Sequence, residues 1–257
     1  MYNKMKNPIS RNIRLYTTNL LMKDISIKIT NDDCHYLKKV MRVSFDEELL
    51  IFNGIDGEWK SKVIGINRDY IELKIINKIR EQINYDNFEC FFTPLKSNRH
   101  NYIIEKLTEL GILSFTPILT DYCNIRKINQ SKMSLRAKEA AEQCGILKVP
   151  TVNKMINFND LLKIDYMHEP LIFFDENCQI QNPLSMIKSL NKGKVYFLIG
   201  PEGGFSDIER DNILKLNNVI RMSLGSRILR ADTAAIVAAS MIQITIGNMY
   251  NKEKIST

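Results

Sequence analysis

Long apolar runs are absent from this chain of 257 residues, although 44% of its residues are hydrophobic. No apolar stretch stays uncharged for the roughly 20 residues that a membrane-spanning helix requires. The first ten residues combine lysines with polar residues and hold no apolar core of a signal peptide. We therefore expect a soluble protein that resides in the cytoplasm and does not bind a membrane.

Cysteine and histidine are scarce, with five and three copies, and they never follow the spacing of paired metal ligands or of a redox pair. The odd number of cysteines disfavours a closed disulfide framework, so we expect reduced thiols and no metal site. Cys144, at the end of a predicted helix, is a nucleophile in principle. The separation of His35, His100 and His168 along the chain favours packing instead.

The excess of positive charge is modest, since 36 Lys and Arg against 29 Asp and Glu give a net charge of +7. Residues 1–81 hold 15 basic and 11 acidic side chains, so this third of the chain carries more than half of the surplus. A basic surplus suits a polyanionic partner. Its distribution makes the N-terminal third the expected RNA-binding surface.

Short alternating apolar runs between turn signals predict a small β-rich unit in the N-terminal third. Strands are expected over residues 14–17, 25–29, 48–52, 58–66 and 70–76. One helix, capped by Asp32 or Asp33, is expected between the second and third strands. Its charged side holds His35, Lys38, Lys39 and Arg42, and its inward side holds Leu37, Val40 and Met41.

Residues 80–87 are polar and follow no pattern, which favours a linker. We therefore expect one domain over residues 1–80 and another over residues 81–257. Beyond the linker, strands and helices alternate as in α/β proteins. Strands are expected over 88–93, up to 119 and over 171–175, and helices are expected over 98–110 and 131–143.

A glycine-rich segment follows a strand near the C-terminus. The apolar run Val195–Ile199 must stop pairing at Gly200 and Pro201, because proline lacks an amide donor. Ser206 and Glu209 then form a capping box that opens a helix. The glycines in between allow a nucleoside-containing ligand to approach the backbone, whereas the alternative is a plain strand-to-helix turn. No Gly-Lys-Ser/Thr sequence follows them, which excludes a nucleotide-hydrolysing P-loop.

A second strand, turn and helix are expected over residues 219–249. The strand ends at Gly225, and the turn concentrates Arg227, Arg230, Asp232 and Thr233 before an almost uncharged helix. A plain turn seldom needs so many charged groups, so this segment favours a binding or catalytic role. The alternative is that Arg230 and Asp232 only pair with each other across the turn.

The strings Leu-Ile-Gly-Pro-Glu-Gly-Gly and Leu-Gly-x-Arg-Ile-Leu-Arg-x-Asp-Thr-Ala resemble the signature of the RsmE family of ribosomal RNA methyltransferases, which belongs to the SPOUT superfamily. Residues 96–111 match its Lys-x-x-Arg and Lys-x-x-Glu-Leu-Gly pattern, and residues 142–144 match its Glu-Gln-Cys segment. The resemblance extends over essentially the whole chain. Two positions depart from it: Asp232 stands where glutamate is common, and Ile146 stands where an arginine usually follows the glycine.

This resemblance implies an α/β fold with a C-terminal SPOUT-type trefoil-knotted domain and an N-terminal PUA-like β-barrel domain. It implies S-adenosylmethionine as the methyl donor. The implied acceptor is N3 of one uridine of 16S rRNA, the position equivalent to U1498, and the implied partner is 16S rRNA or the small ribosomal subunit. The knotted domains are expected to form a homodimer.

The expected site residues combine these motifs with the chemistry of the reaction. Uridine N3 is a poor nucleophile while it carries its proton, so a base or a nearby cation is required. The expected catalytic residues are Arg230, as the cation, and Asp232. The expected cofactor-binding residues are Leu198, Ile199, Gly200, Pro201, Glu202, Gly203, Gly204, Leu224, Gly225, Ile228, Leu229, Arg230, Thr233 and Ala234. The expected RNA-binding residues are Arg11, Arg14, Lys38, Lys39, Arg42, Lys96 and Arg99.

Two other functions remain open at this point. A related SPOUT methyltransferase that acts on another RNA would share the cofactor loops but lack this N-terminal module. A non-catalytic RNA-binding assembly factor would not need the cofactor loops, so their intact sequences count against it.

Overall fold

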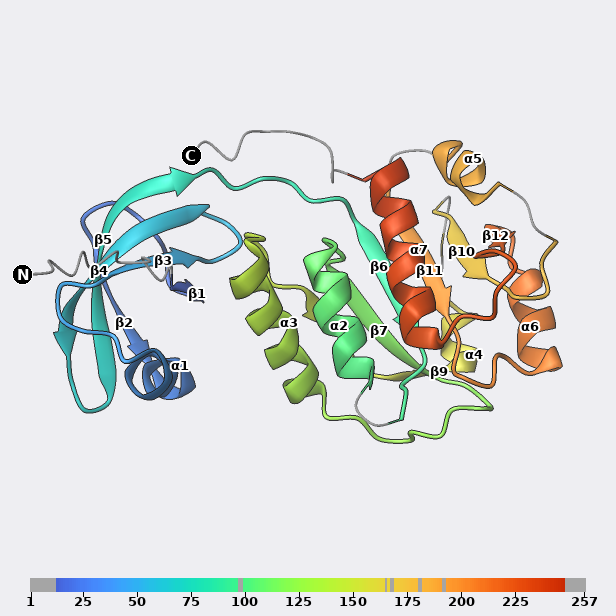
Figure 1. Cartoon of the computed structure of the whole chain (residues 1–257), viewed down its shortest axis with the longest axis horizontal. Coiled ribbons are helices and arrows are strands. Elements are labelled where there is room, and N and C mark those ends of the chain that lie inside the picture. Colours follow the sequence, from blue (N-terminus) through green and yellow to red (C-terminus); the bar gives the residue numbers. More distant parts are fainter. Residues whose placement is uncertain are drawn as a thin grey trace, which may run out of the picture. The chain divides into compact units, whose positions relative to one another are not determined.

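The computed structural model describes residues 13–96, 99–164, 166, 169–179, 182–190 and 193–247. The chain divides into two compact units between Ile83 and Asn84, and Figure 1 shows the first in blue to teal and the second in green to red. This division falls within residues 81–87, which form no helix or strand. None of the described helices is long and apolar enough to cross a membrane.

The N-terminal unit is a five-stranded sheet with strand order β1-β3-β4-β5-β2. Its strands are β1 (Arg14–Tyr16), β2 (Ser26–Thr30), β3 (Glu48–Phe52), β4 (Glu58–Ile66) and β5 (Tyr70–Arg80). The pairs are antiparallel except for β1 with β3. Three register shifts interrupt the long β4–β5 pair, and such bulges bend strands. Alternate residues such as Leu49, Ile51, Leu73 and Ile75 form the core.

The helix of this unit departs from the expectation. Helix α1 (Asn31–His35) continues directly into a π-helical turn, η1 (Tyr36–Met41). The capping prediction was wrong, because Thr30 occupies the N-cap position and the two aspartates lie inside the first turn. Val40 is 60% exposed, whereas Leu37 is fully buried and Met41 packs partly against the core. The wider π-turn changes the helical period and rotates Val40 outward.

The C-terminal unit is a parallel sheet with strand order β12-β10-β11-β6-β7-β8, and β9 pairs with β7. The strands are β6 (Phe88–Phe92), β7 (Ser114–Leu119), β8 (Thr151–Val152), β9 (Ile156–Asn157), β10 (Leu171–Phe174), β11 (Val195–Ile199) and β12 (Val219–Met222). The helices are α2 (Arg99–Glu109), α3 (Gln130–Cys144), α4 (Phe158–Leu161), α5 (Pro183–Lys188), α6 (Asp207–Leu214) and α7 (Ala231–Thr245).

Helices cover both faces of this sheet because its strands are apolar on both sides. In β11, Phe197 and Ile199 pack toward α2, α3, α5 and α7, while Tyr196 and Leu198 pack toward α4 and α6. Figure 1 shows α2, α3 and α7 side by side over the first face. The α/β architecture expected from the alternating pattern is therefore confirmed for this unit.

Four short elements of this unit were not predicted from the sequence. The strands β8 and β9 have two residues each, and α4 and α5 have four and six, which is too short for a period to emerge. The final helix begins at Ala231, two residues before the expected start. It ends at Thr245, with Ile246 as its C-cap, so the expected continuation to about residue 249 was wrong.

Candidate functional site

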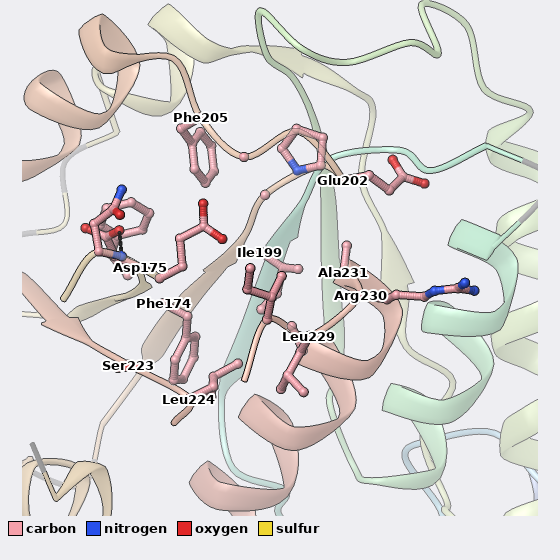
Figure 2. A pocket seen from close by; sticks show the side chains of 18 of the residues that line it. Phe174, Asp175, Ile199, Glu202, Phe205, Ser223, Leu224, Leu229, Arg230 and Ala231 are labelled. Atoms are coloured by element: carbon pink, nitrogen blue, oxygen red, sulfur yellow. Dashed lines mark hydrogen bonds between the residues drawn. The ribbon is translucent and has the colours of Figure 1, made fainter. Parts of the chain in front are cut away.

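Three neighbouring parallel strands, β12, β10 and β11, end at the same edge of the C-terminal sheet. The segments that follow them meet around a cavity of about 340 Å³, which is drawn in Figure 2. Ligands of α/β proteins bind at this edge, because loops from adjacent strands converge there. The glycine-rich segment after β11 and the segment after β12, both identified in the sequence, therefore line one cavity. About twenty residues of chain separate them.

The first segment is held by packing and by a cap. A Cβ on Gly200 would lie 2.7 Å from the ring of Phe205, so only glycine allows this close approach. Gly204 has a φ of +71°, a backbone conformation that glycine adopts without strain. The predicted capping box of Ser206 and Glu209 is confirmed. This segment therefore turns sharply from β11 into α6.

A second contact fixes the same helix start. The Ser206 hydroxyl donates to Oδ2 of Asp121 (2.6 Å), and Oε1 of Glu209 accepts from the Asp121 amide (2.8 Å). Glu209 is buried, and burial raises the pKa of its carboxyl, although hydrogen bonds from the Asp121 and Ser206 amides lower it in part. Through Asp121, the segment that follows β7 therefore fixes the position of the segment that follows β11.

The segment after β12 is tightened by Ser223, whose hydroxyl donates to the Gly225 carbonyl (3.1 Å) and accepts from the Gly225 amide (3.2 Å). Gly225 has a φ of +116°, and a Cβ there would meet no atom within 4 Å. Arg230 is the N-cap residue of α7. Figure 2 shows its exposed side chain directed away from the other labelled residues.

Most of the expected cofactor-binding residues line this cavity. They are Ile199, Gly200, Pro201, Glu202, Gly204, Leu224, Gly225, Ile228, Leu229, Arg230 and Ala234. Three lie elsewhere: Leu198 is buried against the α4 and α6 side of the sheet, Gly203 faces Tyr122, and Thr233 is exposed on α7. Strand alternation explains Leu198, because its neighbour Ile199 points to the opposite face.

The third wall of the cavity follows β10 and was not among the expected site residues. Asp175, Glu176 and Asn177 line it. The available signal was their position: polar residues directly after an apolar strand that belongs to a parallel sheet. Without the strand order, nothing in the sequence placed β10 between β11 and β12.

Asp232 lies close to a motif from another part of the chain. Its Oδ2 atom is 3.9 Å from Nε of Arg99, at the start of α2. In the described part of the chain Arg230 forms no ion pair with Asp232. The alternative in which these two residues only pair with each other across the turn is therefore wrong. An expected RNA-binding residue and an expected catalytic residue are thus brought together beside the cavity.

Two expected RNA-binding residues of the N-terminal unit are engaged within it. Nε of Arg14 lies 2.6 Å from Oε1 of Glu58, and its guanidinium stacks 4.6 Å from the centre of the Phe52 ring. Lys38 donates to the carbonyls of Asn67 and Arg68 in the β4–β5 turn. These intramolecular partners compete with any contact to RNA.

The remaining expected RNA-binding residues are not engaged in this way. Lys39, Arg42 and Lys96 are exposed, while Arg99 has the partner given above. Arg11 lies outside the described residues. The structure therefore offers Lys39 and Arg42 as the accessible cations of the α1–η1 helix.

Comparison with known proteins gives matches over both units. A model of the RNA methyltransferase domain matches residues 83–243, and a model of the RNA methyltransferase PUA domain matches residues 29–76. Ribosomal RNA small subunit methyltransferase E of Buchnera aphidicola subsp. Schizaphis graminum is 31% identical over 92% of this chain and 97% of its own. The protein of the same name from Rickettsia conorii is 28% identical over 90% of this chain and 95% of its own.

Solved structures are similar over the same extent. A Legionella pneumophila methyltransferase structure in complex with the bound cofactor SAM has a TM-score of 0.80 at 25% identity and covers 92% of this chain and 99% of its own. Ribosomal RNA small subunit methyltransferase E from Neisseria gonorrhoeae, bound to S-adenosyl methionine, has a TM-score of 0.81 at 21% identity and covers 92% of this chain and 98% of its own. At 21% identity, the similarity to the Neisseria gonorrhoeae structure shows a shared fold alone.

Proposed function

Because the chain belongs to the ribosomal RNA small subunit methyltransferase E family, RsmE, of RNA methyltransferases, we propose that it methylates N3 of a uridine in 16S rRNA with S-adenosylmethionine as donor. The observation that carries this proposal is the cavity formed by both glycine-containing segments at the ends of β11 and β12. The match to the relatives spans both units, so the proposal concerns the whole chain.

The residues of the cavity fit this cofactor. A volume of about 340 Å³ lies within the range of roughly 300–1,000 Å³ of small-molecule sites. Leu224, Leu229 and Ile199 supply apolar surface for a planar base, and the open space at Gly225 leaves its backbone accessible. When bound, S-adenosylmethionine supplies an electrophilic methyl group on a positively charged sulfur.

The chain's own residues then position the acceptor and stabilise its charge. Arg230 lines the cavity and is exposed at its edge, so its guanidinium can contact the carbonyl oxygens beside uridine N3 and favour the deprotonated uracil. Arginine stays charged at working pH and therefore cannot accept the proton. Asp232, beside Arg99, supplies the carboxylate of α7 for that role or for orienting the arginines.

We infer three further properties from family membership. The C-terminal unit is knotted around the cavity loops, two copies pair through this unit, and the protein works in the cytoplasm. The apolar surface left exposed on α7 and at Ile228 supports pairing, because Ile228 is 90% exposed and Ile244 is 48% exposed. The N-terminal unit is proposed to contact RNA, supported by its PUA match and by exposed Lys39 and Arg42.

Radiolabelled methyl transfer to small ribosomal subunits from a strain that lacks the enzyme tests the proposal, followed by mass spectrometry of the nucleosides. We expect 3-methyluridine. Label in another nucleoside, or in another RNA, would favour the related-methyltransferase alternative. Cofactor binding without any transfer would favour the assembly-factor alternative.

A further inference from the structure

The cavity wall after β10 contains one carboxylate that is fully engaged. Oδ2 of Asp175 accepts hydrogen bonds from Nε of Arg210 (2.9 Å) and of Arg221 (2.6 Å), and its Oδ1 accepts from the Asn177 amide (2.9 Å). Only 3% of the Asp175 side chain is exposed. This carboxylate fastens the end of β10 to α6 and β12, so it is not available to a ligand.

Glu176, the next residue, differs in each of these respects. Its side chain is exposed and lines the cavity, and among the described residues no hydrogen bond or ion pair engages its carboxylate. Its Oε1 atom lies 3.7 Å from the position that a Cβ would take on Gly204. Because Asp175 fixes the backbone just before it, Glu176 presents a free carboxylate beside the glycine-rich segment.

The layout of the cavity indicates which part of the cofactor reaches this carboxylate. Figure 2 shows Asp175 on one side and Arg230 on the other, with Ile199 between them and Leu224 and Leu229 below Ile199 in the view. The acceptor uridine is proposed at the Arg230 side, so the reactive sulfur has to face that side. The nucleoside then extends along the apolar surface toward the segment after β10.

We propose that Glu176 binds the two ribose hydroxyls of S-adenosylmethionine, an inference that rests on the proposed function. A ribose diol offers two adjacent O–H donors, and an ionised carboxylate offers two acceptor oxygens, so a pair of charge-assisted hydrogen bonds forms. Glu176 would thus select a ribonucleoside cofactor and set its position along the cavity. Asp175, which holds the adjoining backbone, is a positioning residue for this contact.

Calorimetric titration of the full-length protein with two ligands tests the proposal. One is S-adenosylmethionine, and the other is 5′-methylthioadenosine, which keeps adenine and ribose but lacks the amino acid and the charge on sulfur. Glu176→Ala is expected to weaken both by a similar factor, roughly 10- to 100-fold, because charge-assisted hydrogen bonds are lost. Glu176→Gln should weaken both by less. The matched control is Asp211→Ala, an exposed carboxylate on α6 that does not line the cavity.

The outcomes separate this inference from the function on which it rests. Weaker binding of S-adenosylmethionine with unchanged binding of methylthioadenosine would overturn the ribose assignment, since Glu176 would then contact the charged part. Unchanged binding of both would overturn any ligand role. A wild-type protein that binds neither ligand would refute the proposed function itself. An unaltered thermal midpoint for each variant shows that the fold is intact.

Discussion

Individual glycines in the cavity segments have different neighbours, and the sequence could not tell them apart. Gly203 was expected to bind the cofactor, but a Cβ on Gly203 would point at Tyr122, 3.4 Å from its Cβ. Gly200 faces Phe205 instead, and Phe205 packs edge-on against Phe173 with ring centres 5.5 Å apart. Which glycine limits the cavity depends on backbone direction, which a one-dimensional motif does not encode.

This difference predicts opposite results for two alanine variants. Gly200→Ala should weaken S-adenosylmethionine binding by roughly 10-fold or more, because its new methyl group displaces the packed ring of Phe205, which lines the cavity. Gly203→Ala should change it by less than about 3-fold, since it adds only a contact outside the cavity. Calorimetric dissociation constants check both values. Equal losses would show that the cofactor also contacts Gly203.

Arg230 is predicted to act on turnover. Arg230→Ala should lower kcat for methyl transfer by roughly 100-fold, the magnitude for loss of one preorganised charge-stabilising group. Binding of S-adenosylmethionine should stay within about 3-fold, because the side chain points away from the other cavity residues. Single-turnover kinetics and calorimetry separate the two quantities, with Arg136→Ala on α3 as the control. Undiminished turnover would remove Arg230 from the catalytic residues.

At the scale of elements, local sequence signals were reliable where contacts are local. The capping box of α6 and the strand bounds of β3, β4 and β11 were predictable because they depend on neighbouring residues. The hydrogen bonds that join Asp121 to Ser206 and to Glu209 span more than eighty residues and have no local signal. The π-turn of η1 also escaped, because it breaks the period on which helix prediction depends.

Glu209 should make stability depend on pH in a defined direction. Burial raises its folded-state pKa, so its contribution to folding is fully present below the unfolded pKa, about 4.3, and is lost as pH rises through the folded value. Glu209→Gln removes this titration. We expect the free energy of unfolding of the wild type, minus that of the variant, to be larger near pH 4 than near pH 7. Urea unfolding at several pH values measures it, and a difference that grows with pH would contradict the assignment.

The α1–η1 helix predicts a division of roles among its cations. Lys39→Ala with Arg42→Ala should weaken binding to small-subunit RNA and reduce the slope of log affinity against log salt by roughly 1 to 2, because exposed phosphate contacts are lost. Lys38→Ala should mainly lower the thermal midpoint, because its ammonium holds the carbonyls of Asn67 and Arg68. Salt titrations of RNA binding and thermal unfolding test both. Identical salt slopes for the double variant and the wild type would place the RNA surface elsewhere.

For the whole molecule, composition and pattern predicted an α/β unit after a β-rich one, but not how its strands are ordered. The cavity exists because β10, between β11 and β12, brings the segment containing Asp175 and Glu176 to the two glycine-containing segments. Such pairings join residues far apart in the chain and depend on the path of the backbone. The family resemblance predicted the kind of fold. The third wall of the cavity, with Asp175 and Glu176, became visible only in the structure.

The last prediction concerns association. On α7, Val237 and Met241 are half-buried and Ile244 is 48% exposed, and their spacing places them on one stripe of the helix. A second copy that covers this stripe would bury it, so we expect a dimer of the 29.8 kDa chain. Met241→Lys with Ile244→Lys should convert it to monomer, since pairing would bury two charges. Size-exclusion chromatography with light scattering measures both masses. A wild-type protein that stays monomeric at every concentration would refute the pairing.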